Sequence, residues 1–330
     1  MRATPKVGLI GLGRIGSRFL EHLLNAGHEV VLHDSNRLAV ERVVEAGKGR
    51  PAGTVTVSDS PAELAATRGL TTVLTVLPDP AALNDVFTGS RGLLRAKGGL
   101  APSLFVNVST VDPETITRLA REVARAPLAP GAAPITASGR PTLLDAPATG
   151  GVVGAQAAEM CFCVGADDQK DIEAARPVLE LLGNHITHTG PVGTGSVAKL
   201  CNALVMSASM AAVSEALALG KRLNVNPAVL TDVLNSGSGR TWAGERYNPA
   251  PGVVKGAPSN HGYRAGQAVD QVRDQLLMLI RAGEQAHSPT PCAKFTEQVY
   301  RALHDEGLGD KDFSSVYRYR YGSGCDNPEW

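Results

Sequence analysis

Residues 7–34, VGLIGLGRIGSRFLEHLLNAGHEVVLHD, decide the fold class of this chain. The stretch starts as an apolar strand, passes through three spaced glycines and continues as an amphipathic helix. Gly11 permits a tight turn, Gly13 lets backbone approach a ligand, and Gly16 lets the helix pack closely. Set between strand and helix, this pattern predicts a loop that binds the pyrophosphate of a dinucleotide. The loop consists of Gly11, Leu12, Gly13, Arg14, Ile15 and Gly16.

The acid that ends the next apolar run bears on the choice of dinucleotide. Asp34 follows EVVLH, at the place where the ribose 2′-hydroxyl would lie. Its carboxylate would repel a 2′-phosphate, so it favours NAD. Arg37 leaves NADP as the lesser alternative, because an arginine nearby is what that phosphate uses. The remaining alternative is a glycine-rich turn in a flavodoxin-like domain that binds no dinucleotide.

Strand-like runs alternate with helical patterns in the first part of the chain, which predicts a parallel sheet covered on both faces. The pattern changes near residue 190, after which no strand is evident. A long helix is expected from Ser196 to Arg222, and apolar spacing with Asn, Pro or Gly ends predicts further helices within 226–237, 268–286 and 289–307. We therefore expect an α/β chain, with a Rossmann-type doubly wound domain over 1–190 and an all-helical domain over 191–330. The strand-like runs are 6–13, 29–34, 54–59, 71–78, 104–110, 142–150 and 159–165.

Two further strand ends point to the same edge of the sheet, since open α/β sheets bind ligands beyond the carboxyl ends of their strands. LTVLPDP and FVNVSTVDP place Leu77-Pro78 and Ser109-Thr110 at that edge. By spacing alone, both are ordinary strand-to-helix loops with a proline or a capping hydroxyl.

Composition and charge limit the classes of partner. Thirty-two basic residues balance thirty-two acidic ones, so we expect neither nucleic acid nor a membrane surface as a partner. No apolar run approaches the roughly 20 residues that a membrane span needs, and no cluster of His, Asp or Glu at ligand spacing predicts a metal site. Five irregularly spaced cysteines indicate a reducing compartment. The cytoplasm is expected for the chain as written, with the mitochondrion as the alternative if the N-terminus was trimmed.

A single lysine is prominent in TGSVAKLCNALVM, residues 194–206, after a Gly/Ser-led helix start. The helix pattern alone favours a solvated Lys199 whose stem covers apolar neighbours. The alternative is an acid/base group of an active site.

Longer motifs resemble the β-hydroxyacid dehydrogenase family, and its 3-hydroxyisobutyrate branch most of all. They are VGLIGLGRIG, VLPDPAALNDVF, VSTVDPET, LLDAPATGGVVGAQ, GTGSVAKLCNA, SGRTWAGERYNPAPGV and KDFSSV, which together span nearly the whole chain. The resemblance implies NAD-dependent oxidation of a small 3-hydroxy acid to its semialdehyde by a homodimer or homotetramer.

The resemblance also implies roles for individual residues. Lys199 matches the family's catalytic lysine, which would act as general acid/base once burial lowers its pKa. The substrate would be bound by Thr149, Gly150, Gly151 and Ser109, and the cofactor by Leu77, Pro78 and Thr110 in addition to the glycine loop and Asp34. Thr149 replaces the family's serine, a mild change that keeps the hydroxyl.

Three positions depart from the family pattern. Ala203 replaces the second asparagine that the family carries one helical turn from its lysine. Gln267 replaces an aromatic residue, and Asp274 replaces a lysine near the cofactor; a one-residue slip would pair that lysine with Arg273 instead. These departures leave two alternatives open: a reductase of a related semialdehyde or imine, and a dinucleotide-binding protein with little turnover.

Overall fold

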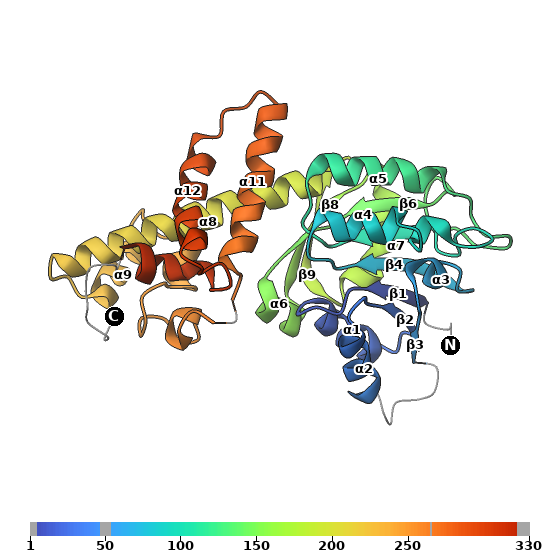
Figure 1. Cartoon of the computed structure of the whole chain (residues 1–330), viewed down its shortest axis with the longest axis horizontal. Coiled ribbons are helices and arrows are strands. Elements are labelled where there is room, and N and C mark those ends of the chain that lie inside the picture. Colours follow the sequence, from blue (N-terminus) through green and yellow to red (C-terminus); the bar gives the residue numbers. More distant parts are fainter. Residues whose placement is uncertain (1–4, 47–53, 265, 322–330) are drawn as a thin grey trace. The chain divides into compact units, whose positions relative to one another are not determined.

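The computed structural model describes residues 5–46, 54–264 and 266–321. The chain divides into two compact units, Met1–Lys199 and Leu200–Trp330, and each is described by itself. Helix α8 (Thr194–Arg222) carries the chain from the first unit into the second (Figure 1). The division therefore lies inside a helix, whereas the sequence predicts a domain boundary before that helix, near residue 190.

A nine-stranded sheet forms the framework of the first unit. Six of its strands are parallel, in the order β3-β2-β1-β4-β5-β6, which is the doubly wound order of dinucleotide-binding domains. The predicted α/β class is thereby confirmed. These strands are β1 (Lys6–Ile10), β2 (Val30–His33), β3 (Val55–Val57), β4 (Leu70–Thr75), β5 (Leu104–Asn107) and β6 (Thr142–Asp145).

The other three strands add antiparallel pairing to the predicted parallel sheet. Strand β8 (Met160–Gly165) is antiparallel to β6 and to β7 (Ala148–Thr149), and parallel to β9 (Gly183–Gly190). The segment that joins β7 to β8 holds little more than the short helix α6 (Gly151–Ala157). A parallel crossover needs a dozen or more residues, so this shorter segment returns the chain antiparallel.

Helices cover both faces of the sheet because neighbouring strand residues alternate between two apolar cores. Leu9 and Leu32 belong to one core, while Ile10 and Val31 belong to the other. The first core is completed by α1 (Gly16–Asn25), α2 (Arg37–Ala46), α6 and α7 (Gln169–Leu179). The second is completed by α3 (Pro61–Ala65), α4 (Pro80–Thr88), the 3₁₀ turn Leu93–Arg95 and α5 (Pro113–Arg125).

Three of these helices begin in the same way. Ser60, Asp79 and Asp112 are extended residues whose side chains accept a backbone N–H three residues further on, and a proline follows each of them. The side chain satisfies an otherwise unpaired donor, and the proline is set for the first helical turn. The sequence pattern therefore fixes where each strand-to-helix loop stops.

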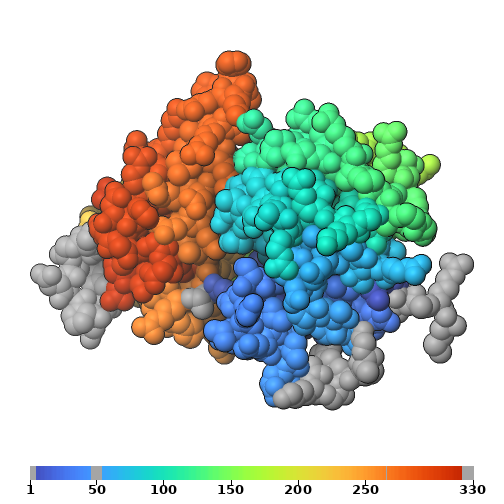
Figure 2. All heavy atoms as spheres, turned by 45° about the vertical axis from the view of Figure 1, so that its right-hand side comes forward, coloured from blue at the N-terminus to red at the C-terminus, as the bar shows by residue number. Residues whose placement is uncertain are grey.

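The second unit is helical around a separate apolar core. Helices α11 (Val269–Gln285) and α12 (Pro291–Asp305) pack along each other and belong to the orange-to-red part of the surface in Figure 2. Among its described residues no strand occurs, and Ala268 and Asp312 form an isolated bridge. The remaining elements are α9 (Pro227–Ser236), α10 (Trp242–Glu245), 3₁₀ turns at Pro258–His261 and Phe313–Ser315, and a π turn at Tyr317–Tyr321.

Helix α8 corrects the expectation that no segment is apolar enough to span a membrane. By length and composition it passes that test, with a mean hydropathy of 1.6 over its best window, although 44% of that window is buried. Leu200, Met210 and Leu217 of this helix lie in the core of the second unit. A buried core helix passes the same test, so the helix is not by itself a sign of a membrane.

Candidate active site

The topology brings the sequence-predicted residues of the first unit to one edge of its sheet. Strands β1, β2, β4, β5 and β6 are parallel, so their carboxyl ends share that edge. The glycine loop follows β1, Asp34 follows β2, and Leu77-Pro78 follow β4. Ser109 and Thr110 follow β5, and the 149–151 turn lies beyond β6.

Backbone contacts explain two of the three loop glycines. Gly11 has φ +102° and donates its N–H to the His33 carbonyl at 3.0 Å. A Cβ on Gly11 would lie 2.1 Å from the Val76 carbonyl oxygen, and one on Gly16 would lie 2.0 Å from the Gly11 oxygen. By contrast, a Cβ on Gly13 would meet nothing within 4 Å. The loop is therefore packed at both ends and open in the middle, as close approach of a ligand requires.

Asp34 joins the end of β2 to this loop. Its carboxylate accepts the N–H of Leu12 at 2.5 Å and the N–H of Asn36 at 2.6 Å. The side chain is half-buried, while Arg37 is exposed at the start of α2. A carboxylate against an open glycine loop fits an NAD ribose and disfavours a 2′-phosphate.

A buried polar network supports the loops after β4 and β5. Thr75 donates its hydroxyl to the Asn107 side-chain oxygen at 3.0 Å, and Asn107 donates its amide to the Ser109 carbonyl at 3.1 Å. Leu77 donates its N–H to the Ser109 hydroxyl oxygen at 2.8 Å. Ser109 is 3% exposed, so its hydroxyl serves to hold residue 77. Half-buried Thr110 and exposed Pro78 lie beside this network.

The 149–151 turn owes its shape to two glycines. Gly150 has φ +132° and Gly151 has φ +61°, conformations that side-chain-bearing residues rarely adopt. Thr149 ends strand β7 opposite Cys161 and is half-buried, whereas both glycines are exposed. Backbone N–H groups of such a turn can bind an anion.

Lys199 lies in the second turn of α8 and is buried, with 8% of its surface exposed. The exposed lysine that the helix pattern alone favours is therefore wrong. Burial lowers the pKa of its amino group to about 8, and the nearby Cys163 thiol opposes that fall. A lysine with such a pKa can exchange a proton near neutral pH.

Asp145 is a residue of this edge to which the sequence reasoning assigned no role. It ends β6, is fully buried, and accepts the N–H groups of Gly193 and Ser196 at the start of α8. The signal that could have revealed it is an acid that ends the apolar run TLLD ahead of a glycine-rich turn.

The three departures lie in the second unit. Ala203 is 1% exposed, one turn after Lys199 on α8, and Asn202 is exposed. Asp274 is exposed on α11, and half-buried Gln267 accepts the Phe313 N–H through its carbonyl at 2.9 Å.

Arg273, the alternative match to the family lysine, is paired inside the same unit. Its guanidinium donates to Glu297 of α12 at 3.0 Å, and that carboxylate is 2% exposed. The charge of Arg273 therefore serves to join α11 to α12.

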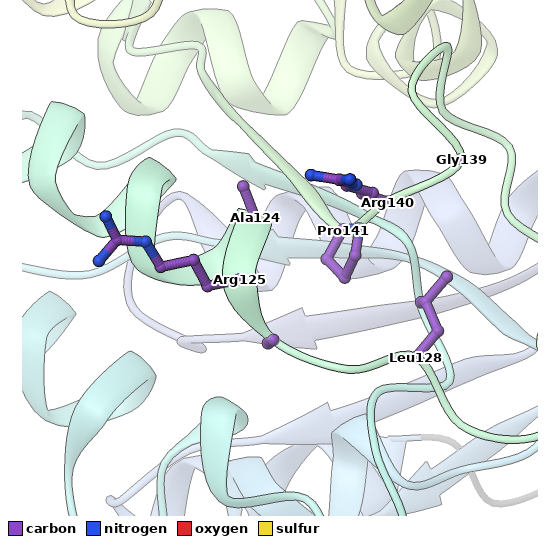
Figure 3. Close-up of a pocket in the computed structure, with 7 residues that line it drawn as sticks. Ala124, Arg125, Leu128, Gly139, Arg140 and Pro141 are labelled. Carbon is purple, nitrogen blue, oxygen red and sulfur yellow. The ribbon is translucent and has the colours of Figure 1, made fainter.

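The hollow drawn in Figure 3 lies elsewhere on the first unit. It has a volume of about 430 Å³ and is bounded by the end of α5 and the residues that precede β6. Arg125 and Arg140, both exposed, lie on its rim, and Pro141 comes directly before β6. It therefore sits at the amino end of that strand, at the opposite edge from the candidate site. Among the described residues, no cluster of three or more histidine, cysteine or acidic side chains could hold a metal.

Comparisons with known proteins match both units. Residues 6–190 match the family described as the NAD binding domain of 6-phosphogluconate dehydrogenase. Residues 193–320 match the NAD-binding family of NADP-dependent 3-hydroxyisobutyrate dehydrogenase. The first unit is thus an NAD-binding Rossmann domain, and its match ends at residue 190.

Two curated relatives are similar over most of their length. One, from Arabidopsis thaliana, is named probable 3-hydroxyisobutyrate dehydrogenase, mitochondrial; it is 37% identical over 96% of this chain and 87% of its own. A second relative of the same name, from Dictyostelium discoideum, is 35% identical over 96% of this chain and 91% of its own length. The solved Mycobacterium tuberculosis 3-hydroxyisobutyrate dehydrogenase with L-serine has a TM-score of 0.80 and 28% identity, over 96% of this chain and 98% of that one.

Proposed function

Because this chain belongs to the 3-hydroxyisobutyrate dehydrogenase family, we propose that it oxidises a small 3-hydroxy acid of the 3-hydroxyisobutyrate type to its semialdehyde. It is an NAD-dependent oxidoreductase. Lys199 is the proposed general acid/base. The observation that carries this assignment is a lysine at 8% exposure whose pKa falls to about 8, at the edge where the sheet binds ligands.

The proton transfer follows from the charge of the amine. A primary alcohol can lose hydride only if its hydroxyl proton also leaves, so a proton acceptor must lie beside that oxygen. Lysine can accept the proton only in its neutral, amine form. Burial of Lys199 lowers its pKa to about 8, so a much larger share of the amine is neutral near pH 8 than in an exposed lysine. In the reverse direction, the ammonium form of Lys199 donates a hydrogen bond to the carbonyl oxygen and returns the proton.

The residues proposed to hold NAD are the glycine loop, Asp34 and the loops after β4 and β5. NAD supplies the hydride acceptor. The open space over Gly13 supports close contact with a pyrophosphate, and the carboxylate of Asp34 supports a free ribose 2′-hydroxyl. Leu77, Pro78 and Thr110 are proposed to line the NAD site. The Ser109 hydroxyl oxygen holds residue 77 in place by accepting the Leu77 N–H.

The substrate carboxylate is proposed to bind at the 149–151 turn. Thr149 offers a hydroxyl, and the two exposed glycines offer backbone N–H groups. Ser109, which the family resemblance also suggested as a substrate contact, is better supported as a residue that positions Leu77, because its hydroxyl already bonds the Leu77 N–H.

A panel assay tests this function. Purified protein with NAD or NADP and a set of short 3-hydroxy acids should produce reduced cofactor, fastest with NAD and a branched four-carbon acid such as 3-hydroxyisobutyrate. Lys199→Ala should lower kcat by about 10²-fold or more, the usual size of a lost acid/base group. Lys221→Ala, on the last turn of the same helix, is the matched control and should keep full activity.

The panel also separates the alternatives. Cofactor binding without turnover of any member would favour a dinucleotide-binding protein, to which Ala203 and Asp274 lend support. Reduction of an imine with no oxidation of any hydroxy acid would favour a reductase. Full activity in Lys199→Ala would exclude the proposed mechanism.

We also propose that the enzyme works as a homodimer or homotetramer. Large apolar side chains of the second unit are exposed on α8, directly after its last residue, on α9 and on α12. Contact with another copy would bury them, and such apolar surface is typical of an interaction site. They are Leu219, Leu223, Val229, Val233 and Phe295.

A reducing compartment is proposed for the chain. Cys161, Cys163, Cys201 and Cys292 are all free thiols. The cytoplasm and the mitochondrial matrix both fit; the two curated relatives are named as mitochondrial. Fractionation of cells that express the full chain distinguishes them.

A further inference from the structure

We propose that Asp145 is a positioning residue that holds the first turn of α8 against the sheet and thereby sets the place of Lys199. This inference rests on the proposed function, because Asp145 can position the acid/base of the reaction only if Lys199 is that group.

Hydrogen bonds make the first link. One oxygen of the Asp145 carboxylate accepts the Gly193 N–H at 3.0 Å, and the other accepts the Ser196 N–H at 2.7 Å. Both donors belong to the start of α8, where backbone N–H groups have no partner inside the helix. A carboxylate there is also favoured by the helix dipole. Lys199 follows Ser196 by less than one turn, so a displaced first turn displaces the lysine as well.

The surroundings of the carboxylate leave little room for movement. A Cβ on Gly165, the partner of Asp145 in strand β8, would lie 2.0 Å from a carboxylate oxygen. A Cβ on Gly195 would lie 2.4 Å from the Cys163 carbonyl oxygen and 2.6 Å from that of Asp145. The helix therefore touches the backbone of β6 and β8 directly, because glycine occupies each point of approach.

The buried carboxylate of Asp145 lowers the stability of the fold, so its presence calls for a reason other than stability. Asp145 is fully buried, and this burial raises its pKa to about 6 in spite of the two backbone donors. A group whose charged form is disfavoured in the folded state lowers stability above that pH. The Cys163 thiol on β8 interacts electrostatically with Asp145, with Lys199 on α8 and with Cys161.

Asp145→Asn tests the inference with almost no change of volume. An amide can accept a hydrogen bond with its oxygen, but its NH₂ group must then face the second N–H donor. One contact to α8 is lost, so we expect kcat to fall on the order of tenfold to a hundredfold, as for a small misplacement of a reacting group. The KM for the hydroxy acid and the binding of NAD should change much less.

A second readout needs neither substrate nor cofactor. The pKa of Lys199 can be followed through its ε-carbon chemical shift in protein made with isotope-labelled lysine, and the signal assigned by its loss in Lys199→Met. If Asp145 holds the lysine in its buried place, Asp145→Asn should move that pKa upward from about 8 toward 10.5. Loss of the negative charge alone would move it downward, so the direction separates positioning from simple electrostatics.

Asp171→Asn is the matched control. Asp171 is also a buried carboxylate, 4% exposed, and accepts a backbone N–H from Ala137 at 2.7 Å, but it lies on α7. It should leave kcat and the Lys199 pKa unchanged. Gly195→Ala pushes α8 from the sheet while Asp145 stays intact, and should reproduce the Asp145→Asn result.

The outcomes are distinct. A Lys199 pKa that stays at its wild-type value or falls in Asp145→Asn, with kcat preserved, overturns the inference and leaves the proposed function standing. Absence of turnover in the wild-type enzyme overturns the proposed function, whereas the shift of the Lys199 pKa still decides whether Asp145 holds the lysine.

Discussion

Lys199 carries both the function and a cost in stability. Folding lowers its pKa from 10.5 to about 8 because the ammonium is taken out of water. Below pH 8 the side chain is charged in both the folded and the unfolded chain, so the whole cost is present there. Between pH 8 and 10.5 the unfolded chain binds more protons, so this group makes stability rise with pH. The fall in pKa corresponds to on the order of 3 kcal/mol.

Replacement of Lys199 by methionine should therefore give an inactive but more stable protein. Methionine fills a similar volume without a charge to bury. We expect the thermal midpoint at pH 7 to rise by several degrees, with a smaller gain at pH 10. Calorimetry at the two pH values checks this, and Lys221→Met serves as control. A midpoint lower than that of the wild type would mean that the ammonium is well solvated in the folded enzyme.

At this scale the sequence predicts residue types better than their surroundings. The glycine loop and Asp34 can be predicted from local sequence, because the glycines mark a tight turn and Asp34 directly follows a strand. The burial of Lys199 does not, because helix periodicity cannot tell which polar side chain the fold covers. The role of Asp145 was not predicted for a related reason: the groups that it binds are backbone N–H groups of residues 193 and 196, far along the chain.

Among the elements, the turn from β1 into α1 separates glycines needed for folding from the glycine needed for binding. Gly16 packs against the Gly11 carbonyl, whereas Gly13 faces open space. A methyl group at residue 16 strains the loop, while one at residue 13 meets only the ligand.

Gly13→Ala should keep the thermal midpoint of the wild type and weaken NAD binding by roughly tenfold or more, since backbone approach to the pyrophosphate is blocked. Gly16→Ala should lower both quantities. Thermal unfolding and NAD titration by fluorescence measure the pair. If Gly13→Ala binds NAD as tightly as the wild type, the glycine loop is not the pyrophosphate site.

Prediction of the elements succeeded where patterning is strong. The helices at 227–236, 269–285 and 291–305 are amphipathic and end at proline, asparagine or glycine signals, and the expected segments cover them. Strand β9 was not predicted because its residues, GNHITHTG, are mostly polar and only Gly183 is buried, at the border of the sheet. Strands β7 and β8 lie within predicted strand-like runs, but their antiparallel direction was not predicted. Strand direction depends on the length of the connection, which apolar runs do not reveal.

For the whole molecule, the exposed apolar residues of the second unit predict self-association. Phe295 is 61% and Leu219 is 57% exposed, and both line a hollow of about 430 Å³ that also carries Glu215, Arg222 and Arg320. We expect sedimentation to give the mass of two or four copies of the chain. Phe295→Glu should shift the equilibrium toward the single chain, because a charge would be buried at the contact.

Val44→Glu is the control for that shift, since Val44 is an exposed apolar residue of the first unit, on α2. It should leave the assembly unchanged. A wild-type protein that sediments as one chain at micromolar concentration would refute the proposed oligomer. The description of each unit's fold does not depend on that result.

The central claim for the whole enzyme is that a buried, neutral Lys199 accepts the hydroxyl proton, and the pH dependence of kcat tests it most directly. Oxidation needs the neutral amine, so kcat with a 3-hydroxy acid and NAD should rise with pH through about 8 and then level off. Reduction of the semialdehyde needs the ammonium and should fall through the same pH. The residual activity of Lys199→Ala should lack this step. A step near pH 8 that persists in Lys199→Ala would contradict the account, because the titrating group would then be another residue.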